Sequence, residues 1–345
     1  MRESMAARRI DEVDALRGFA AVAVLLFHYS TRISQIYGEQ AAPSVAFPQG
    51  HLGVNLFFII SGFVIFMTLN ATKRPLDFLV GRFSRLFPTY WAAIVVTFVI
   101  TALLGLPGRT VSAVDALANF IMLHGLFGVP HVDGVYWSLE VELLFYAMML
   151  CLFAAGLLRH IHLILLCLLA LPALAGLLGW PLVPGVFRRL LILDHLPWFV
   201  LGICVHLQTR PREPGDTSRS RWLAAAALVT IGLGQGVLAI VALVLAVAVW
   251  AAASGRLPFL RLGPLVWLGA VSYPLYLIHQ NVGYSLILAM QGIDIHRDVA
   301  AFGAMLVSLG LAASLHRWVE LPAMAGIRAW WRGLKAADKG LSPRA

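Results

Sequence analysis

The feature that most constrains the fold of this chain is its series of long apolar runs. Of its 345 residues, 60% are hydrophobic and only 12% are charged, whereas about a quarter of the residues in a soluble domain are charged. The runs are about 17 to 23 residues long, and a helix of that length crosses a hydrocarbon core roughly 30 Å thick. Because backbone groups in lipid must bond within their own segment, the sequence predicts an all-α polytopic membrane helix bundle.

Hydropathy places about ten transmembrane helices along the chain. The expected spans are residues 13–32, 51–70, 86–106, 135–157, 162–180, 190–208, 221–236, 237–254, 265–290 and 298–320. We expect residues 1–345 to form a single transmembrane domain with a core of about 10–325. The basic tail, 326–345, is expected to form a short interfacial helix. The apolar stretch 116–129 is too short to span and is expected to be re-entrant or interfacial, and 208–221 is the clearest loop.

The distribution of basic residues predicts the orientation. If the N-terminus is cytoplasmic, nineteen Lys and Arg residues fall on the cytoplasmic side and five on the other. The positive-inside rule then predicts cytoplasmic termini for a multi-pass protein of the cell (inner or plasma) membrane. The net charge of +9 has the same explanation, and without a basic stripe interleaved with aromatic residues we expect no nucleic-acid partner.

The first span carries two ionisable residues, Arg17 and His28. A charged group at the centre of a span costs at least about 2.5 kcal/mol, so such residues are the first candidates for function. The two are eleven residues apart, which is about three turns and about 16 Å along one helix face. A cation near the cytoplasmic end and a titratable base deeper in the membrane would suit a long anionic donor. The alternative is that Arg17 extends to the interface while His28 bonds a neighbouring helix.

Two further motifs lie at helix ends. Arg82 and Arg85 precede the third span and share a helix face, where they could grip phosphates or serve only as positive-inside arginines. Glu140 and Glu142 open the fourth span, in the segment Trp137-Ser-Leu-Glu-Val-Glu. They cannot share a face, because two residues rotate about 200°. Glu142, one step deeper, is the better candidate to orient an imidazole; the alternative is that both carboxylates simply meet water.

Two more positions in the last spans are notable. His279 lies in the middle of the ninth span, after Pro274, which should kink that helix. It could line the cavity, although a structural histidine with satisfied hydrogen bonds fits the position better. Glu320 closes the last span, where we expect a structural cap or an ion pair with Arg317.

Six stretches, in order, resemble the acyltransferase 3 family of multi-spanning membrane acyltransferases. They are VDALRGFAAVAVLLFHY (13–29), GHLGVNLFFIISGFVI (50–65), FLVGRFSRLFPTYW (78–91), YWSLEVELLFY (136–146), LGAVSYPLYLIH (268–279) and RWVELP (317–322). The family's Arg-x10-His falls on Arg17 and His28, and its Arg-x-x-Arg falls on Arg82 and Arg85. Its Trp-Ser-Leu-x-x-Glu falls on 137–142. Asn55 departs from the family, because many members have an acidic residue there.

The resemblance implies an O-acyltransferase that moves an acyl group, expected to be acetyl, from acyl-CoA to a carbohydrate hydroxyl. The acceptor would be a cell-surface or exopolysaccharide, or its lipid-linked precursor. The expected roles are His28 and Glu142 in catalysis; Arg17, Arg82 and Arg85 in donor binding; and Asn55, Trp137, Tyr146 and His279 in substrate binding. No metal or tightly bound cofactor is expected, and the lipid bilayer and polysaccharide-assembly proteins are the further expected partners.

The rival interpretation is a transporter or flippase for a lipid-linked sugar or a small anion. Ten spans with buried His, Arg and Glu fit that class too. Transporters commonly show repeated halves with matching broken helices, and the two halves of this sequence show no such symmetry.

Overall fold

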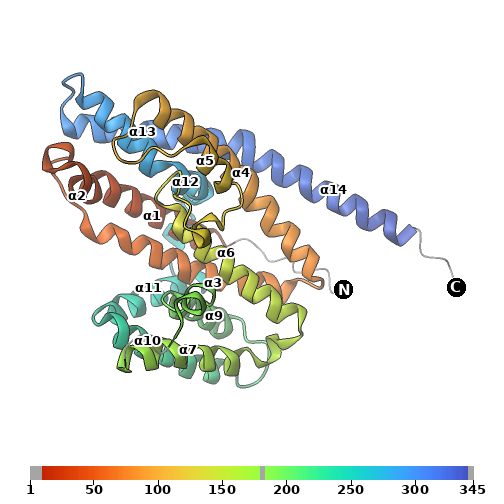
Figure 1. Ribbon diagram of the computed structural model, residues 1–345. Helices are drawn as coiled ribbons and strands as arrows, with labels where there is room; N and C mark the ends of the chain where they lie inside the picture. The colour runs from red at the N-terminus through yellow and green to blue at the C-terminus, as the bar shows by residue number, and fades with distance from the viewer. Residues whose placement is uncertain (1–9, 179–182, 341–345) are drawn as a thin grey trace. The chain divides into compact units, whose positions relative to one another are not determined.

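The computed structural model describes residues 10–178 and 183–340, and within these ranges the chain is helical without any strand. The expected all-α fold is therefore confirmed. The α-helices are α1 (Asp11–Phe27), α2 (Ile33–Tyr37), α3 (Gly53–Ala71), α4 (Pro75–Leu104), α5 (Ala113–Asn119), α6 (Tyr136–Ala154), α7 (Ile161–Leu178), α8 (Gly185–Leu190), α9 (Leu196–Thr209), α10 (Asp216–Gln235), α11 (Leu238–Ala253), α12 (Gly263–Gln291), α13 (Arg297–Leu315) and α14 (Leu321–Gly340) (Figure 1).

Each of the ten expected spans coincides with one of the longer helices, but not all of these helices have the character of a span. By length and composition, six segments of the described residues can cross a membrane: Asp11–Tyr37, Pro48–Ala71, Pro75–Leu104, Tyr136–Ala154, Leu157–Leu178 and Arg297–Ala337. Helices α9 and α11 are apolar but shorter. Helix α10 begins with charged and small polar residues, and α12 carries buried polar side chains, among them Ser272, His279 and Asn281.

Two expected segments differ in detail. The stretch 116–129 contains the end of α5 and a 3-10 turn, His124–Phe127; its re-entrant or interfacial position stays a prediction. The loop expected at 208–221 is shorter, because α10 already begins at Asp216. The Asp216 carboxylate accepts hydrogen bonds from the backbone amides of Arg212 (2.9 Å) and Glu213 (3.2 Å), which closes the turn.

The chain forms two compact units, each assembled from segments that are distant in sequence. Unit 1 comprises Met1–Leu26, Gln49–Lys73 and Trp137–Ala270, and unit 2 comprises Phe27–Pro48, Arg74–Tyr136 and Val271–Ala345.

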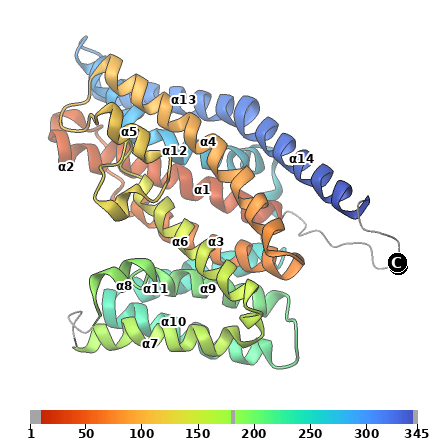
Figure 2. The ribbon, with the colours of Figure 1, turned by 45° about the vertical axis from the view of Figure 1, so that its right-hand side comes forward.

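Unit 1 is organised around α3 and α9, which pack along each other, with α10 between α7 and α9 (Figures 1 and 2). Glycine makes the α3–α9 approach possible. A Cβ atom on Gly62 would overlap the carbonyl oxygen of Phe199, and one on Gly202 would overlap that of Ile59. Small residues at such contacts let helix backbones pack closely, as is typical of helices in membranes.

In unit 2, α4 lies beside α13 and α14 in both views (Figures 1 and 2). A π-helical turn, His316–Glu320, joins α13 to α14. The Asp77 carboxylate on α4 accepts hydrogen bonds from Trp331 Nε1 (2.7 Å) and Lys335 Nζ (2.8 Å) on α14. The helix expected in the basic tail, 326–345, is thus present as far as Gly340 and docked on α4, while 341–345 lie outside the described residues. Its interfacial location stays a prediction.

Candidate active site

The candidate base, His28, is the first residue of a π-helical turn, His28–Arg32, that follows α1. Such turns are rare and often mark functional sites. The next residue, Tyr29, is buried, and its hydroxyl donates to the carbonyl oxygen of His279 (2.8 Å) and bonds Ser308 Oγ (2.7 Å). The bare Gly283 leaves room for the Tyr29 ring, which would overlap a Cβ there. Tyr29 thus fixes the π turn against α12.

His28 and His279 are brought together in unit 2 although they are 251 residues apart in the chain. Nδ1 of His28 lies 3.1 Å from Nε2 of His279, and the two ring centroids are 4.9 Å apart. His279 is fully buried, whereas His28 is half-buried. The sequence identified both histidines separately, and the structure shows that they form one hydrogen-bonded pair.

The carbonyl groups around His279 determine how the pair shares its protons. Nδ1 of His279 lies 2.9 Å from the carbonyl oxygen of Tyr276 and 3.2 Å from that of Leu275. Because carbonyls only accept hydrogen bonds, this nitrogen carries the proton. A fully buried imidazolium is costly, so Nε2 of neutral His279 accepts from Nδ1–H of His28. Nε2 of His28 is then the nitrogen with the lone pair, as a general base requires.

A buried carboxylate fixes the helix turn that follows His279. Asp133 Oδ2 accepts a hydrogen bond from the backbone amide of Asn281 (2.9 Å), and Asp133 Oδ1 accepts one from that of Val135 (3.2 Å). The Asn281 amide group in turn donates to the carbonyl oxygen of Val132 (2.8 Å). Burial raises the pKa of Asp133 to about 7, against the lowering effect of these two amides. Asp133 therefore fastens the loop before α6 to α12.

Tyr284 on α12 is a neighbour of His28 that the sequence did not indicate. Its ring centroid lies 6.3 Å from that of His28 and 5.9 Å from that of Tyr37. The Arg109 guanidinium lies over the ring, 5.8 Å from its centroid. Within the described residues the buried Tyr284 hydroxyl has no hydrogen-bond partner. The sequence after His279, Gln-Asn-Val-Gly-Tyr, has no pattern that indicates a role for this tyrosine.

The second candidate catalytic residue, Glu142, lies in unit 1 on α6. Its Oε1 accepts hydrogen bonds from Ser61 Oγ on α3 (2.7 Å) and from the Tyr146 hydroxyl one turn further along α6 (2.5 Å). The structure thus joins Glu142 to Tyr146, a candidate substrate-binding residue. The role of Glu142 as the orienting partner of His28 stays a prediction.

The remaining unit 1 candidates lie on three helices. Trp137 is 40% exposed at the start of α6, and its ring meets those of Phe58 and His195 at centroid distances of 6.3 and 5.4 Å. Asn55 on α3 and Arg17 on α1 are each half-buried. The exposed Trp137 ring is therefore the one of these side chains with the surface that stacking on a sugar requires.

The donor-binding candidates Arg82 and Arg85 are one turn apart on α4 and half-buried. Arg82 lies over the Phe78 ring, 5.8 Å from its centroid. Arg85 Nη1 is 3.8 Å from Glu320 Oε1, and the other oxygen of Glu320 is 2.7 Å from His316 Nδ1. Glu320 thus forms an ion pair, but its described charged partner is Arg85 rather than the expected Arg317, and its second oxygen bonds His316.

Comparison with known proteins identifies the class of protein to which this site belongs. Over residues 10–317 the sequence matches a family described as an acyltransferase domain, and the chain belongs to that family. The resemblance to the acyltransferase 3 family is therefore confirmed. The chain is a membrane protein and a transferase of acyl groups other than aminoacyl groups. Because an acyltransferase is an enzyme, membership of this family argues against the transporter interpretation.

Individual relatives add detail. The chain is 27% identical to the acyltransferase MdmB of Streptomyces mycarofaciens, with 92% of each chain covered. It is 27% identical to the peptidoglycan O-acetyltransferase OatA of Listeria monocytogenes over 40% of this chain and 23% of OatA. It is 34% identical to the exopolysaccharide production protein ExoZ of Rhizobium meliloti over 29% of this chain and 33% of ExoZ. No solved structure is significantly similar to the chain.

Proposed function

We propose that the protein is an O-acyltransferase of the cell (inner or plasma) membrane that moves an acetyl group from acetyl-CoA to a carbohydrate hydroxyl. The acceptor is a cell-surface or exopolysaccharide, or its lipid-linked precursor. The observation that carries the proposal is the His28–His279 pair, whose hydrogen bonds leave the Nε2 lone pair of His28 as the acceptor. A base within an apolar helix bundle is what acyl transfer to a weakly acidic hydroxyl requires.

In the proposed reaction, Nε2 of His28 takes the proton of the acceptor hydroxyl as its oxygen bonds to the thioester carbonyl carbon. The carbonyl π electrons move onto the carbonyl oxygen and return as the carbon–sulfur bond breaks. The leaving thiolate takes the proton from His28, so the products are the ester and free coenzyme A. His279 holds the His28 ring in the required tautomer, as an orienting group does in other nucleophile–base pairs. Glu142 stabilises the imidazolium.

The donor enters from the cytoplasm. Arg82 and Arg85 bind coenzyme A phosphates, and Arg17 steadies the donor along α1. Nucleotides are cytoplasmic, and nineteen of the basic residues fall on the side assigned to the cytoplasm, in a ten-span arrangement with both termini there. Guanidinium groups one helix turn apart suit phosphate oxygens, which accept paired N–H donors.

The acceptor class is supported by two relatives whose names refer to peptidoglycan O-acetylation and to exopolysaccharide production. The exposed Trp137 and the Tyr146–Glu142 pair offer an aromatic face and hydrogen-bonding groups, the means by which proteins bind sugars. Asn55 is the further polar candidate on α3. Polysaccharide-assembly proteins would bring the acceptor to the membrane.

A transfer assay tests the proposal. The purified chain in lipid nanodiscs is supplied with acetyl-CoA carrying a labelled acetyl group and with polysaccharide from cells that lack the gene. Label should appear in the polysaccharide as an ester that mild alkali releases, together with one free thiol per ester. Mass spectrometry of glycans from cells with and without the gene should show the same acetyl group. Thiol release that the gene product does not accelerate would contradict the proposal.

A further inference from the structure

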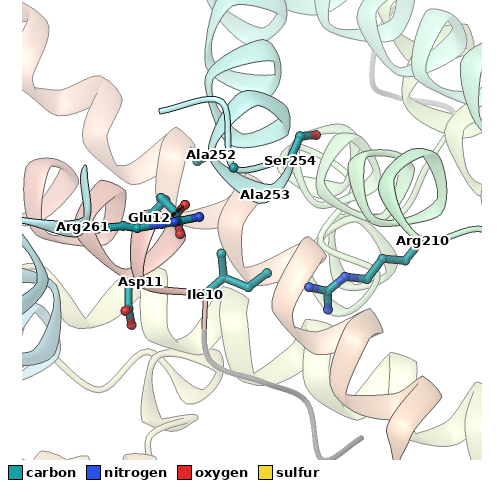
Figure 3. Close-up of a pocket in the computed structure, with 9 residues that line it drawn as sticks. Ile10, Asp11, Glu12, Arg210, Ala252, Ala253, Ser254 and Arg261 are labelled. Carbon is teal, nitrogen blue, oxygen red and sulfur yellow. Dashed lines mark hydrogen bonds and ion pairs between the residues drawn. The ribbon is translucent and has the colours of Figure 1, made fainter. Parts of the chain in front are cut away.

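A cavity in unit 1 has no role in the chemistry described above. It has a volume of about 490 Å³, within the range of roughly 300 to 1,000 Å³ that small-molecule sites occupy. It lies between the start of α1, the end of α9 and the segment that follows α11 (Figure 3). Its lining residues are Ile10, Asp11, Glu12, Arg210, Ala252, Ala253, Ser254, Gly255 and Arg261.

The charges that line this cavity are not evenly compensated. Glu12 Oε1 lies 2.6 Å from Arg261 Nε, so these two charges form an ion pair. Arg210 donates only a weak hydrogen bond, from Nη1 to the sulfur of Met67 (3.2 Å), and no carboxylate of the described residues pairs with it. Figure 3 shows its guanidinium directed toward Ile10 from the side opposite the Glu12–Arg261 pair, while the Asp11 carboxylate points elsewhere.

All three segments around the cavity belong to the side that the positive-inside rule assigns to the cytoplasm. Helix α1 begins at the cavity. The Ile10 carbonyl accepts the first hydrogen bonds of α1, from the amides of Val13 and Asp14. Arg17 is seven residues after Ile10, so it lies about two turns and about 10 Å further along nearly the same face. A ligand in the cavity would therefore lie about 10 Å along α1 from Arg17, the donor-binding candidate.

We propose that this cavity binds the 3′-phosphoadenosine end of coenzyme A, with Arg210 as the phosphate-binding residue. The proposal rests on the acyl-CoA donor proposed above. Coenzyme A carries phosphate at two places, the 5′-diphosphate and the 3′-phosphate, so a cation that binds the 3′-phosphate can act apart from those that bind the diphosphate. Arg210 is an exposed arginine that lines the cavity and that no carboxylate of the described residues neutralises, and such a guanidinium is suited to bind a phosphate.

The test varies the donor and Arg210 together. Full-length protein in nanodiscs is assayed for thiol release and ester formation with acetyl-CoA, 3′-dephospho-acetyl-CoA and S-acetylpantetheine. Arg210→Gln should raise KM for acetyl-CoA about tenfold to a hundredfold, as the loss of a charge-assisted hydrogen bond does. It should leave KM for the two donors that lack the 3′-phosphate unchanged within about twofold. Arg210→Lys, which keeps the charge, should lose less affinity for acetyl-CoA.

Arg219→Gln is the matched control, because Arg219 is an exposed arginine in the first turn of α10 that does not line the cavity. It should leave KM for all three donors unchanged. An equal loss of activity with every donor in the Arg210→Gln protein would mean that Arg210 contacts lipid headgroups or supports the fold, and would overturn the proposal. So would an unchanged KM for acetyl-CoA. A wild-type protein that ignores all three thioesters would instead contradict the proposed function itself.

Discussion

At the scale of single residues, the proposed chemistry depends on His28. We predict that His28→Gln abolishes acyl transfer while acyl-CoA binding and yield of folded protein stay near the wild-type level. Glutamine keeps a hydrogen-bonding group but cannot take a proton near neutral pH, and general base catalysis contributes about a hundredfold to ten-thousandfold in rate. Labelled ester formation measures the loss, and His28→Ala should behave alike. Substantial transfer by the Gln variant would make His28 a structural hydrogen-bond partner.

A second residue-scale prediction concerns His279. Its Nε2 accepts from His28, and it touches no reacting atom, so it is a positioning residue. His279→Leu should lower kcat about tenfold to a hundredfold, with KM for the donor unchanged. His279→Gln should recover part of kcat, because a glutamine oxygen can still accept from His28 Nδ1. Steady-state kinetics separates kcat from KM.

His316→Gln serves as the control, because His316 also begins a π-helical turn, His316–Glu320, and it bonds Glu320 there. Equal kcat losses in the His279→Leu and His279→Gln proteins would show that His279 only supports the fold.

Sequence reasoning finds these side chains better than it finds their partners. His28 and His279 stood out because polar groups are costly within apolar runs. Their hydrogen bond could not be predicted, because a bond across 251 residues depends on how helices pack. Asp133 and Tyr284 were missed for a related reason: both are buried, and neither lies in a pattern that distinguishes a buried polar group from an exposed one.

At the scale of helices, α4 carries the prediction about donor binding. Replacing Arg82 and Arg85 together by Gln should weaken acyl-CoA binding, and the loss should shrink at high salt because part of the attraction is screened. Glu320 keeps its contact with His316 in this variant, so its buried charge is not left alone. Binding measured in nanodiscs at low and high salt tests the effect. Unchanged affinity of the folded double variant for acyl-CoA would mean that these arginines serve only to set the orientation of the chain in the membrane.

The α3–α9 contact gives a prediction about stability. Gly202→Val should lower the free energy of unfolding by about 1 to 3 kcal/mol or more, because its side chain would collide with the backbone of α3. Gly310→Val on α13 is the control, because a Cβ atom there meets open space. Thermal unfolding in detergent, followed by size-exclusion chromatography, compares the two. Equal unfolding temperatures would mean that the two helices do not pack through this glycine.

Hydropathy located the helices well and their internal features poorly. The ten apolar runs each coincide with a helix because a run of that length has few other ways to satisfy its backbone. The π turn at His28–Arg32 was not predicted, since average polarity carries no information on hydrogen-bond register. The early start of α10 was missed because Asp216, whose carboxylate closes the turn before the helix, lies in a polar segment typical of a loop.

At the scale of the whole molecule, segments of the two compact units alternate along the chain. Unit 1 draws on three separate segments and so does unit 2. The candidate residues divide accordingly: unit 1 carries Arg17, Asn55, Trp137, Glu142 and Tyr146, and unit 2 carries His28, Arg82, Arg85 and His279. Each unit therefore holds part of the set of candidate residues, and each part is drawn from separate segments of the chain.

The last prediction concerns the orientation of the chain. The bias of nineteen basic residues against five predicts that the loop 208–221 and the C-terminus are cytoplasmic. Cys151, Cys167 and Cys204 are first replaced by Ser or Ala, because the first two are exposed and would react. In that background, Ser218→Cys and a cysteine added after Ala345 should resist a membrane-impermeant thiol reagent in intact cells. Both should react once the membrane is opened.

Gln40→Cys, an exposed position on the opposite predicted side, should react in intact cells and shows that the reagent is active. This pattern would leave Arg210 and its cavity on the side where acyl-CoA is present. Labelling of Ser218→Cys from outside, without labelling of Gln40→Cys, would mean that the chain has the opposite orientation in the membrane. The Arg210 cavity would then face a compartment without nucleotides, and neither it nor Arg82 and Arg85 could receive the donor from the cytoplasm.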